Sequence, residues 1–414
     1  MPVKRFPSDV TAAEIRSLSP DMPVEAVAAI LRDVKSGGDH AVLEFEHRFG
    51  GAATPEDGAK LRPVDREFIA AALDEIDSEL RAALELAIAN VRQVAETQVT
   101  NDQTVSLAQG QSIEYLSTPV KRAAAYIPGG RGSYPSTAVM CLVSAHAAGV
   151  ESIVAVSPAR EHGEVDSAVA AVCGLLGVTE LYAIGGAQAI AALAYGTETI
   201  APVDVIVGPG NSYVQEAKRQ LVGRVGIDGV AGPSELVVVA DSTADSEAIA
   251  LDLLAQGEHG PDSLVVLISP DPELIDAVIE RAKSIEAEMA VVLAHDLDSG
   301  VALADALAPE HMQIAAADSE LERLASGVTR AGCLFVGHNA ATAFGDYVVG
   351  SNHVLPTGGA ARYASALSVS TFRRRMSRVT IPDAAVGPLA RAGARIADAE
   401  GFPLHGRSME ARNK

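Results

Sequence analysis

Thiols are scarce in this chain of 414 residues. The three cysteines, Cys141, Cys173 and Cys333, are widely separated and form no C-x-x-C pair. A sparse and odd number of cysteines argues against a disulfide framework and fits a reducing compartment. It also argues against a zinc site made of thiolates, so any metal here has to be bound by histidine, carboxylate or amide groups.

Basic residues are also in short supply, because 32 Lys and Arg stand against 54 Asp and Glu, for a formal net charge of -22. A field of this sign repels phosphate backbones and anionic membrane surfaces. We therefore expect neither nucleic acid nor a membrane as a partner. The charge fits a salt-rich habitat and ordinary solubility equally well, and it says nothing about the fold.

Long apolar stretches are missing as well. No uninterrupted apolar run reaches the roughly 18 residues that a membrane-spanning helix requires. The amino-terminal sequence MPVKRFPSDV lacks the apolar core of a secretory signal. We therefore expect a cytoplasmic protein. Hydrophobic residues still make up 48% of the chain, which is enough for a large core.

Two kinds of apolar periodicity divide the chain. Residues 1 to about 100 predict helices, because the run REFIAAALDEIDSELRAALELAIANVRQVAE carries apolar residues at three- and four-residue spacing. From about residue 122, short apolar runs such as SIVAVS, VDVIV and SLVVLI alternate with helical patterns. This alternation predicts βα units in mostly parallel sheets. A break at AGPSE (231–235) divides them into two α/β halves, and the last 45 or so residues predict a helical tail.

The usual dinucleotide fingerprints are absent, because no G-x-G-x-x-G follows a strand and there is no P-loop. Glycine-rich turns instead follow three strand-like runs, at 126–130 (YIPGG), 185–188 (GGAQ) and 208–211 (GPGN). Glycine lets the backbone approach a ligand closely, and α/β proteins bind ligands at the carboxyl ends of parallel strands. The three turns predict a ligand crevice. They do not identify NAD, and each alone is equally explained as turn chemistry.

Three polar motifs are candidates for chemistry. Gln256 and His259 end the helical pattern EAIALDLLAQGEH on one helix face and could converge on one ion, or could form only a polar helix end. Glu310 and His311 precede the run MQIAAA and pair an acid with an imidazole, but they need a loop geometry to act together. The irregular segment 344–368, which holds Asp346, is either a functional loop or a solvated one.

Read in order, the segments between Tyr126 and Ser408 resemble the histidinol dehydrogenase family. Eight matching segments in the same order are far more specific than any single motif. They favour the functional interpretation of each motif above. The matching segments are YIPGGRGSYPS, GGAQAIAALAYGTETI, VDVIVGPGNSYV, GIDGVAGPSELVVVAD, DLLAQGEHGPDS, APEHMQI, GDYVVGSNHVLPTGGAARYASALS and EGFPLHGRS.

The resemblance implies a zinc-dependent enzyme that oxidises L-histidinol to L-histidine through the aldehyde, with two NAD⁺, as the last step of histidine biosynthesis. Gln256, His259 and Asp346 are the implied zinc ligands from one subunit, and His405 is the fourth, from the partner of a homodimer. In this family the metal clamps the amino and imidazole nitrogens of the substrate rather than chiefly polarising the alcohol.

The resemblance also implies roles for further residues. Glu310 is expected to activate the water that attacks the aldehyde, and His311 to act as the base for alcohol and hydrate protons. The resemblance also implies which residues contact NAD and which contact the substrate. The NAD contacts are Tyr126, Gln188 and Asn211, and the substrate contacts are Ser136, Ser234, Gln256, His259, His311, Asp346, His353, Glu400 and His405.

The implied fold class is α/β, with two incomplete Rossmann-like parallel-sheet domains and small helical terminal domains that exchange in the dimer. Such a fold explains a dehydrogenase without the glycine fingerprint. We expect an N-terminal segment, a first α/β domain with the metal and catalytic residues, a second α/β domain that binds NAD, and a C-terminal helical tail. The N-terminal segment is predicted to contain residues 1–22, and the first α/β domain residues 23–125 and 236–368. The second α/β domain is predicted to contain residues 126–235, and the tail residues 369–414.

The chain departs from the family pattern before Asp346, where Ala341 and Thr342 stand in place of a common Pro-Glu pair. Leu404 replaces the usual alanine before His405. These changes concern the identity of the substrate rather than the metal or hydride chemistry. One alternative is a relative on the same scaffold that oxidises another polar alcohol, such as a sulfonated diol. Another is a zinc hydrolase that uses Glu310 without a nicotinamide.

Overall fold

The computed structural model describes residues 3–16, 22–50, 60–129, 132–160 and 163–413. It divides into two compact units, which we describe separately. The larger unit contains Met1–Gln98 and Lys121–Phe372, and the smaller one contains Val99–Val120 and Arg373–Lys414.

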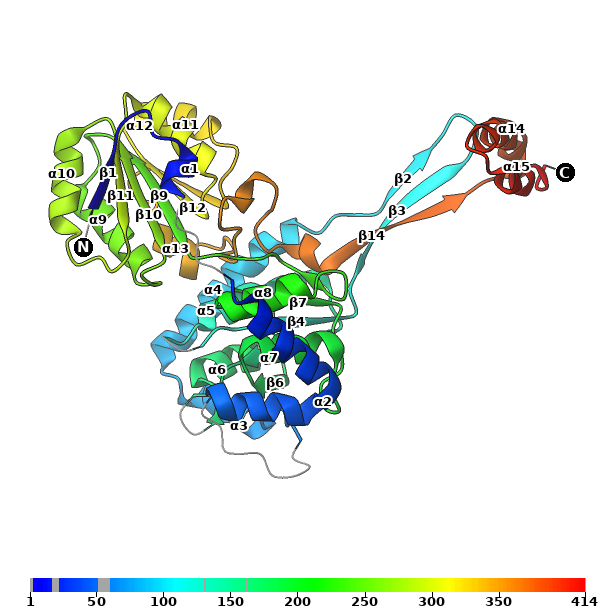
Figure 1. The fold of residues 1–414 in the computed structure, drawn as a ribbon, viewed down its shortest axis with the longest axis horizontal. Helices are drawn as coiled ribbons and strands as arrows, with labels where there is room; N and C mark the ends of the chain where they lie inside the picture. Colours follow the sequence, from blue (N-terminus) through cyan, green and yellow to red (C-terminus); the bar gives the residue numbers. More distant parts are fainter. Residues whose placement is uncertain (1–2, 17–21, 51–59, 130–131, 161–162, 414) are drawn as a thin grey trace. The chain divides into compact units, whose positions relative to one another are not determined.

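One parallel sheet of the larger unit has the strand order β1-β11-β10-β9-β12-β13 (Figure 1). Helices cover both of its faces, α9 and α10 on one side and α1, α11 and α12 on the other. This explains why its central strands β9, β10 and β11 are almost wholly apolar rather than alternating. The strands are β1 (Val3–Phe6), β9 (Glu235–Ala240), β10 (Leu264–Ser269), β11 (Met289–Leu293), β12 (His311–Ala315) and β13 (Cys333–Val336). The helices are α1 (Ala12–Ile15), α9 (Ser246–Gly257), α10 (Pro272–Arg281), α11 (Leu297–Leu307) and α12 (Asp318–Ser326).

A second parallel sheet has the order β6-β5-β4-β7-β8. Helices α7 and α8 pack on one face, and α5 contacts strands β4 and β5. The strands are β4 (Arg122–Tyr126), β5 (Ser152–Ser157), β6 (Glu180–Ala183), β7 (Val205–Val207) and β8 (Gly226–Ile227). The helices are α5 (Pro135–Ala148), α6 (Ser167–Leu175), α7 (Gly186–Tyr195) and α8 (Ser212–Gln220).

The amino-terminal helices form an outer layer around this second sheet. Helix α2 (Val24–Gly50), bent at Gly38 with φ 54°, packs on α7 and α8. Helices α3 (Arg66–Glu75) and α4 (Ser78–Thr97) pack on α6 and α5. The predicted assignment of residues 23–125 to the first α/β domain therefore differs from the observed packing. Amphipathic periodicity shows that a helix has an apolar face, but not which sheet buries it.

The described part of the predicted N-terminal segment (1–22), residues 3–16, packs with the first sheet. Strand β1 pairs in parallel with β11, with Val3 opposite Met289, and Ile15 of α1 is buried in the core. Late in the larger unit come the helix α13 (Thr342–Tyr347) and two short 3₁₀ helices, η2 (Ala360–Arg362) and η3 (Val369–Phe372).

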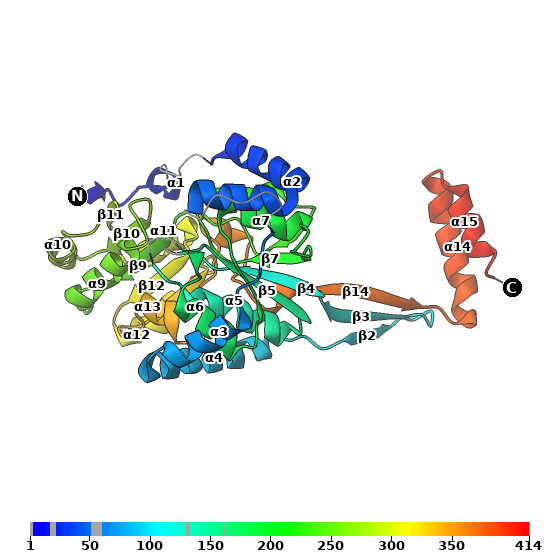
Figure 2. The same cartoon turned by 90° about the horizontal axis from the view of Figure 1, so that it is seen from below.

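The smaller unit is an antiparallel ribbon in the order β14-β3-β2, followed by the helix pair α14 and α15 (Figure 2). The prediction of a purely helical tail from residue 369 is wrong, because β14 pairs with β3 along its whole length. Its sequence, RRRMSRVT, is almost wholly exposed and has no apolar alternation that would indicate a strand. The elements are β2 (Gln103–Ser106), β3 (Ser112–Pro119), β14 (Arg373–Thr380), α14 (Asp383–Ala399) and α15 (Pro403–Glu410).

The predicted α/β class with parallel sheets is confirmed. Within the residues that the structure describes, no helix has the length and apolar character needed to cross a membrane.

Candidate active site

A pocket of about 640 Å³ opens in the larger unit. Its size is within the usual range for small-molecule sites. On one side it is lined by loops that follow the carboxyl ends of β4, β7 and β8, and on the other by residues at the amino ends of β9 and β12. Eight predicted site residues line it: Ser136, Asn211, Ser234, His259, Glu310, His311, Asp346 and His353.

Glu310 lies at the wall of this pocket, in the loop before β12, and is buried. Its Oε2 atom accepts hydrogen bonds from the Ser234 hydroxyl at 2.7 Å and from the Glu235 backbone N–H at 2.8 Å. Burial raises the pKa of Glu310 to about 7, although His311, Ser234 and the Glu235 N–H all act to lower it. A carboxyl group in this range can exchange protons near neutral pH.

His311 is the first residue of β12 and is almost fully buried. Its Nδ1 lies 3.1 Å from the backbone carbonyl oxygen of Glu235, and its Nε2 lies 3.6 Å from Oδ1 of Asp346. Burial acts to lower the pKa of His311, but the carboxylates of Glu310 and Asp346 outweigh it and raise the pKa to about 9. Because an N–H at Nδ1 can donate to the carbonyl, Nε2 is the ring nitrogen that can accept a proton.

The loop geometry that the acid–imidazole pair requires is present. The Oε2 atom of Glu310 and Nδ1 of His311 are 3.7 Å apart. Ala308, two residues earlier, has a φ of +47°, the single positive φ of a non-glycine residue in the described part of the chain. This left-handed turn ends α11 and redirects the chain towards β12.

Three of the predicted metal ligands belong to the larger unit. Gln256 and His259 lie at the end of α9, and Asp346 lies in α13. Gln256 is buried and donates from its Nε2 to the Ser234 hydroxyl oxygen at 2.7 Å. No cluster of three or more His, Cys, Asp or Glu side chains suited to a metal occurs among the described residues. His259 and Asp346 are the two members of the predicted set in this unit that belong to those residue types.

The electrostatics of these groups suit metal binding. Burial lowers the pKa of His259, which favours the neutral imidazole. Burial acts to raise the pKa of Asp346, but the imidazoles of His311, His353 and His259 outweigh it, so the pKa is lowered and the carboxylate is ionised. His353 holds its Nδ1 2.7 Å from the Asp346 backbone oxygen and its Nε2 3.1 Å from the Thr137 hydroxyl.

The predicted NAD contacts fall into two groups. Asn211 lines the pocket and caps α8 by accepting from the backbone N–H groups of Tyr213 and Val214. Tyr126 and Gln188 are buried and do not belong to the pocket lining. The hydroxyl of Tyr126 accepts from the Gly186 N–H at 3.1 Å.

Glu46 of α2 accounts for the orientation of Gln188. Its Oε1 accepts from the Gln188 amide at 2.9 Å and from the Gly185 N–H at 2.8 Å. Burial raises the pKa of this carboxyl group. The turn at the amino end of α7 is therefore held by a side chain that lies far away in the sequence.

A buried ion pair holds the glycine turn after β7. The ammonium of Lys218 pairs with Asp228 and donates to the Gly208 carbonyl at 3.0 Å, and Asp228 accepts from the Gly208 N–H at 2.7 Å. Gly208 has a φ of +113°, and a Cβ there would lie 2.1 Å from the Tyr126 carbonyl oxygen, so no other residue fits.

Two predicted site residues, Glu400 and His405, belong to the smaller unit. Glu400 caps the end of α14, and His405 is on α15 with its ring packed edge-on against Phe402. Both residues are exposed. Exposed apolar side chains, Ile396, Phe402 and Leu404, surround them in the sequence.

Thr342, one of the two predicted departures before Asp346, is buried at the start of α13, one turn before Asp346. In the part of the chain that the structure describes, its hydroxyl has no hydrogen-bond partner. It does not belong to the pocket lining.

Comparison with known proteins shows the family of this chain. The sequence model of the histidinol dehydrogenase family matches residues 16–413. The chain belongs to the histidinol dehydrogenase family. A histidinol dehydrogenase of Zymomonas mobilis is 43% identical over 93% of this chain and 92% of its own length. One of Ruegeria pomeroyi is 43% identical over 96% of this chain and 93% of its own length.

Solved structures agree with the family. The crystal structure of histidinol dehydrogenase from Elizabethkingia anophelis has a TM-score of 0.91 at 28% identity and covers 99% of this chain and 98% of that one. An acetylating aldehyde dehydrogenase from Geobacillus thermoglucosidasius, at 13% identity and a TM-score of 0.50, shares the fold alone. The predicted family and oxidoreductase class are confirmed, and neither rival reaction is favoured.

Several residues that shape the site were not predicted. Arg16, Glu46, Lys218, Asp228 and Glu235 lie outside the three polar motifs, and each holds a turn or loop of the site in place. One signal was available: a charge that heads a wholly apolar run, as in ELVVVA, has to be paired when the strand is buried.

Removing the Lys218 charge should strongly destabilise the protein. The Lys218→Met variant leaves Asp228, which is 6% exposed, without its cation, and should lose about 3–5 kcal/mol of unfolding free energy. The double variant Lys218→Met/Asp228→Asn should regain part of the loss, because neither charge is then buried. Urea denaturation measures both.

Lys283→Met is the matched control, because the Lys283–Glu280 pair is 65% and 69% exposed. It should cost less than about 1 kcal/mol. Equal losses in Lys218→Met and Lys283→Met would contradict the role assigned to the buried pair.

Proposed function

We propose that this chain oxidises L-histidinol to L-histidine through the aldehyde, with two NAD⁺ as hydride acceptors, in the last step of histidine biosynthesis. The observation that carries the proposal is the buried pair of Glu310 and His311, which shares one pocket with His259, Asp346 and the glycine turn at Asn211. Such a pocket combines two proton-transfer groups of different pKa with candidate cofactor contacts. The family membership of the chain supports the same reaction.

We further propose that Gln256, His259 and Asp346, with the partner subunit's His405, hold a zinc ion. The donor set fits: a neutral imidazole, an ionised carboxylate and an amide oxygen are available, and none of the three free cysteines is among the proposed ligands. When bound, the metal would clamp the substrate nitrogens and neutralise the carboxylate of Asp346. His311 would then lose one of the two anions that raise its pKa, and could act as a base.

In the first oxidation, His311 accepts the hydroxyl proton at Nε2 while a hydride leaves the substrate carbon. Its Nδ1–H remains donated to the Glu235 carbonyl, which keeps the ring oriented. Hydrogen bonds from Ser234 and Glu235 hold Oε2 of Glu310, and Oε1 of Glu310 accepts a proton from the water that adds to the aldehyde. His311 has to release its first proton to solvent before it takes the hydrate proton, as the second hydride leaves for a second NAD⁺.

We also infer a cytoplasmic homodimer in which each active site receives Glu400 and His405 from the partner subunit. The support is the exposure of Glu400 and His405 next to the exposed apolar side chains of Phe402 and Leu404. The free thiols fit a reducing compartment. In such an arrangement Tyr126, Gln188 and Asn211 serve the cofactor side of each site.

Formation of NADH tests the reaction, because its absorbance at about 340 nm reports hydride transfer directly. L-Histidinol and L-histidinal should both be oxidised, and sulfonated diols and unrelated amino alcohols should not. Preferential turnover of a sulfonated diol, or hydrolysis without NADH, would overturn the proposed function.

The same assay separates the two catalytic residues. Glu310→Gln should slow oxidation of added aldehyde at least as much as that of the alcohol, and His311→Ala should slow both steps, each by about 10²–10⁴-fold. Metal content should stay unchanged in both variants. Near wild-type rates in both would remove the pair from the mechanism.

Metal analysis of the purified protein tests the ligand set. We expect about one zinc per subunit in the wild type. His259→Ala should bind none and lose turnover while the circular dichroism spectrum stays unchanged. His295→Ala, at a side chain that is 86% exposed, is the control and should keep its zinc. Full occupancy in His259→Ala would show that the ligands are wrongly assigned.

Complementation tests whether each site uses two chains. The His405→Ala and Glu310→Gln proteins, which should each be nearly inactive, are mixed after mild dissociation. If His405 acts in trans, half of randomly formed dimers are mixed and each has one intact site, so activity should return to about a quarter of wild type. If His405 acts within its own chain, every site carries a lesion. Background activity in proven mixed dimers would exclude the shared site.

A further inference from the structure

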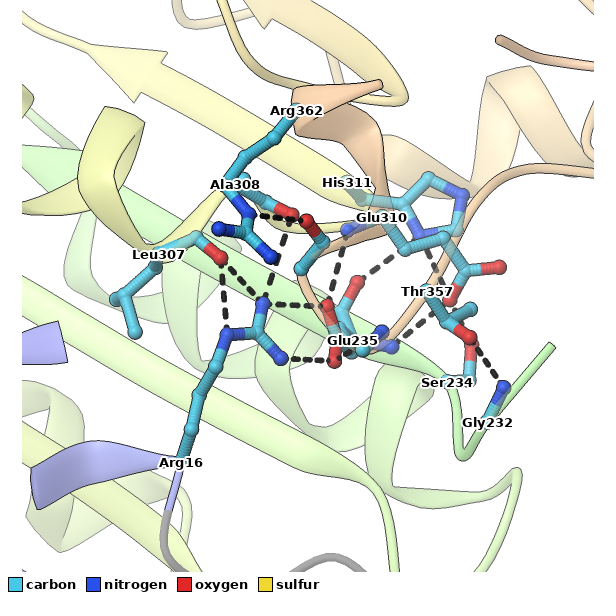
Figure 3. Close-up of polar contacts among 12 residues, drawn as sticks. Arg16, Gly232, Ser234, Glu235, Leu307, Ala308, Glu310, His311, Thr357 and Arg362 are labelled. Carbon is cyan, nitrogen blue, oxygen red and sulfur yellow. Dashed lines mark hydrogen bonds and ion pairs between the residues drawn. The ribbon is translucent and has the colours of Figure 1, made fainter. Parts of the chain in front are cut away.

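An ion pair joins Arg16, near the amino terminus, to Glu235 at the wall of the pocket (Figure 3). Arg16, which follows α1, forms a two-pronged contact with Glu235, the first residue of β9: Nη1 lies 2.5 Å from Oε1 and Nη2 lies 2.9 Å from Oε2. The side chains of Arg16 and Glu235 are 20% and 4% exposed. Planar two-pronged pairing of this kind fixes geometry as well as charge.

The carboxylate of Glu235 is also bonded to two loops of the pocket. Its Oε2 accepts from the Glu310 N–H at 3.2 Å, and its Oε1 accepts from the Gly358 N–H at 2.9 Å. The main chain of Glu235 contacts the same site, because its N–H donates to Glu310 and its carbonyl lies against Nδ1 of His311. One residue therefore holds the backbone and the side chain of Glu310 and orients the imidazole.

Arg16 holds the other end of the same loop. Its Nε donates to the Leu307 carbonyl at 2.9 Å, and its Nη2 reaches that carbonyl at 2.5 Å and the Ala308 carbonyl at 3.5 Å. Ala308 has the left-handed backbone that turns the chain towards Glu310. An alanine is strained in this conformation, so surrounding contacts have to maintain it.

We propose that Arg16 and Glu235 are positioning residues for the Glu310–His311 pair. The guanidinium fixes the Glu235 carboxylate and the 307–308 carbonyls together, and this sets where the carboxyl group of Glu310 faces the pocket. The two residues bind no substrate and transfer no proton. The inference rests on the proposed function for its kinetic test, because the reaction is what measures the position of Glu310.

The expected kinetic effect is specific. Loss of the pair should lower kcat. It should leave KM within about twofold, because Gln256, His259 and Asp346, the residues of this unit proposed to hold the metal that clamps the substrate, are not bonded to Arg16 or Glu235. A misplacement of about 1 Å caused by a residue away from the reacting atoms can cost about 10²-fold. We expect a decrease in kcat of roughly 10- to 100-fold in Arg16→Met, with zinc content unchanged and with a smaller loss in Arg16→Lys.

Arg122→Met is the matched control. Arg122 pairs with Glu180 through the same two-pronged geometry and is 17% exposed, but it lies at the amino end of β4, away from the pocket lining. The Arg122→Met variant should have a lower thermal midpoint than the wild type and an unchanged kcat.

The double variant Arg16→Met/Glu235→Gln separates positioning from stability. It buries no unpaired carboxylate, so its thermal midpoint should recover relative to Arg16→Met, but kcat should stay low because the loop contacts remain lost. Recovery of kcat together with stability, or a wild-type kcat in Arg16→Met, would overturn the proposal.

Hydrogen exchange gives a readout that does not depend on the reaction. The amides of Glu310 and Gly358, both bonded to the Glu235 carboxylate, should exchange at least tenfold faster in Arg16→Met and at the wild-type rate in Arg122→Met. If the wild-type protein fails to oxidise L-histidinol, the proposed function fails, and this exchange still decides the role of Arg16. Unchanged exchange at both amides would overturn it.

Discussion

The parallel pairing of β9 with β12 is the constraint on which the pocket wall depends. The paired register of the two strands starts with His311 opposite Leu236. Glu310 and Glu235 each come one residue earlier in the chain, so they also lie side by side. Three contacts of the acid–imidazole pair follow from this, because the Glu235 N–H, carbonyl and carboxylate all face the Glu310–His311 segment. A shift of one residue in the register would separate the pair from these groups.

The two sheets contribute opposite ends of their strands to one pocket. The glycine turns follow the carboxyl ends of β4 and β7, as is usual for ligand sites in α/β proteins. The proposed catalytic pair, Glu310 and His311, lies instead at the amino end of β12, beside the amino end of β9. Backbone N–H groups are free at that end of a strand, and one of them, from Glu235, donates to Glu310. The pocket therefore combines the ligand-binding edge of the sheet with β4 and β7 and the edge of the sheet with β9 and β12, where a backbone N–H stabilises the buried carboxylate of Glu310.

Buried charges around the pocket occur as pairs that hold loops. Lys218 with Asp228 fixes the turn at Gly208, and Arg16 with Glu235 fixes the turn at Ala308. Burying an ion pair gains little net stability, because both groups lose their water. Both of these pairs bond to backbone groups of the loops that line the pocket, so their contribution is to the shape of the site.

The sequence alone determined the class of the fold and the family, because βα alternation and ordered motifs are local properties of the chain. It also predicted the residues that we propose carry the chemistry, and its few thiols argue that a metal here would need nitrogen and oxygen ligands. Tertiary structure decided which sheet buries α2, where β1 and β14 pair, and which groups hold Glu310. Arg16 and Glu235 are 219 residues apart, and no spacing along the chain reports that they meet. Contacts of that kind are set by how the apolar faces pack, and only the folded chain defines them.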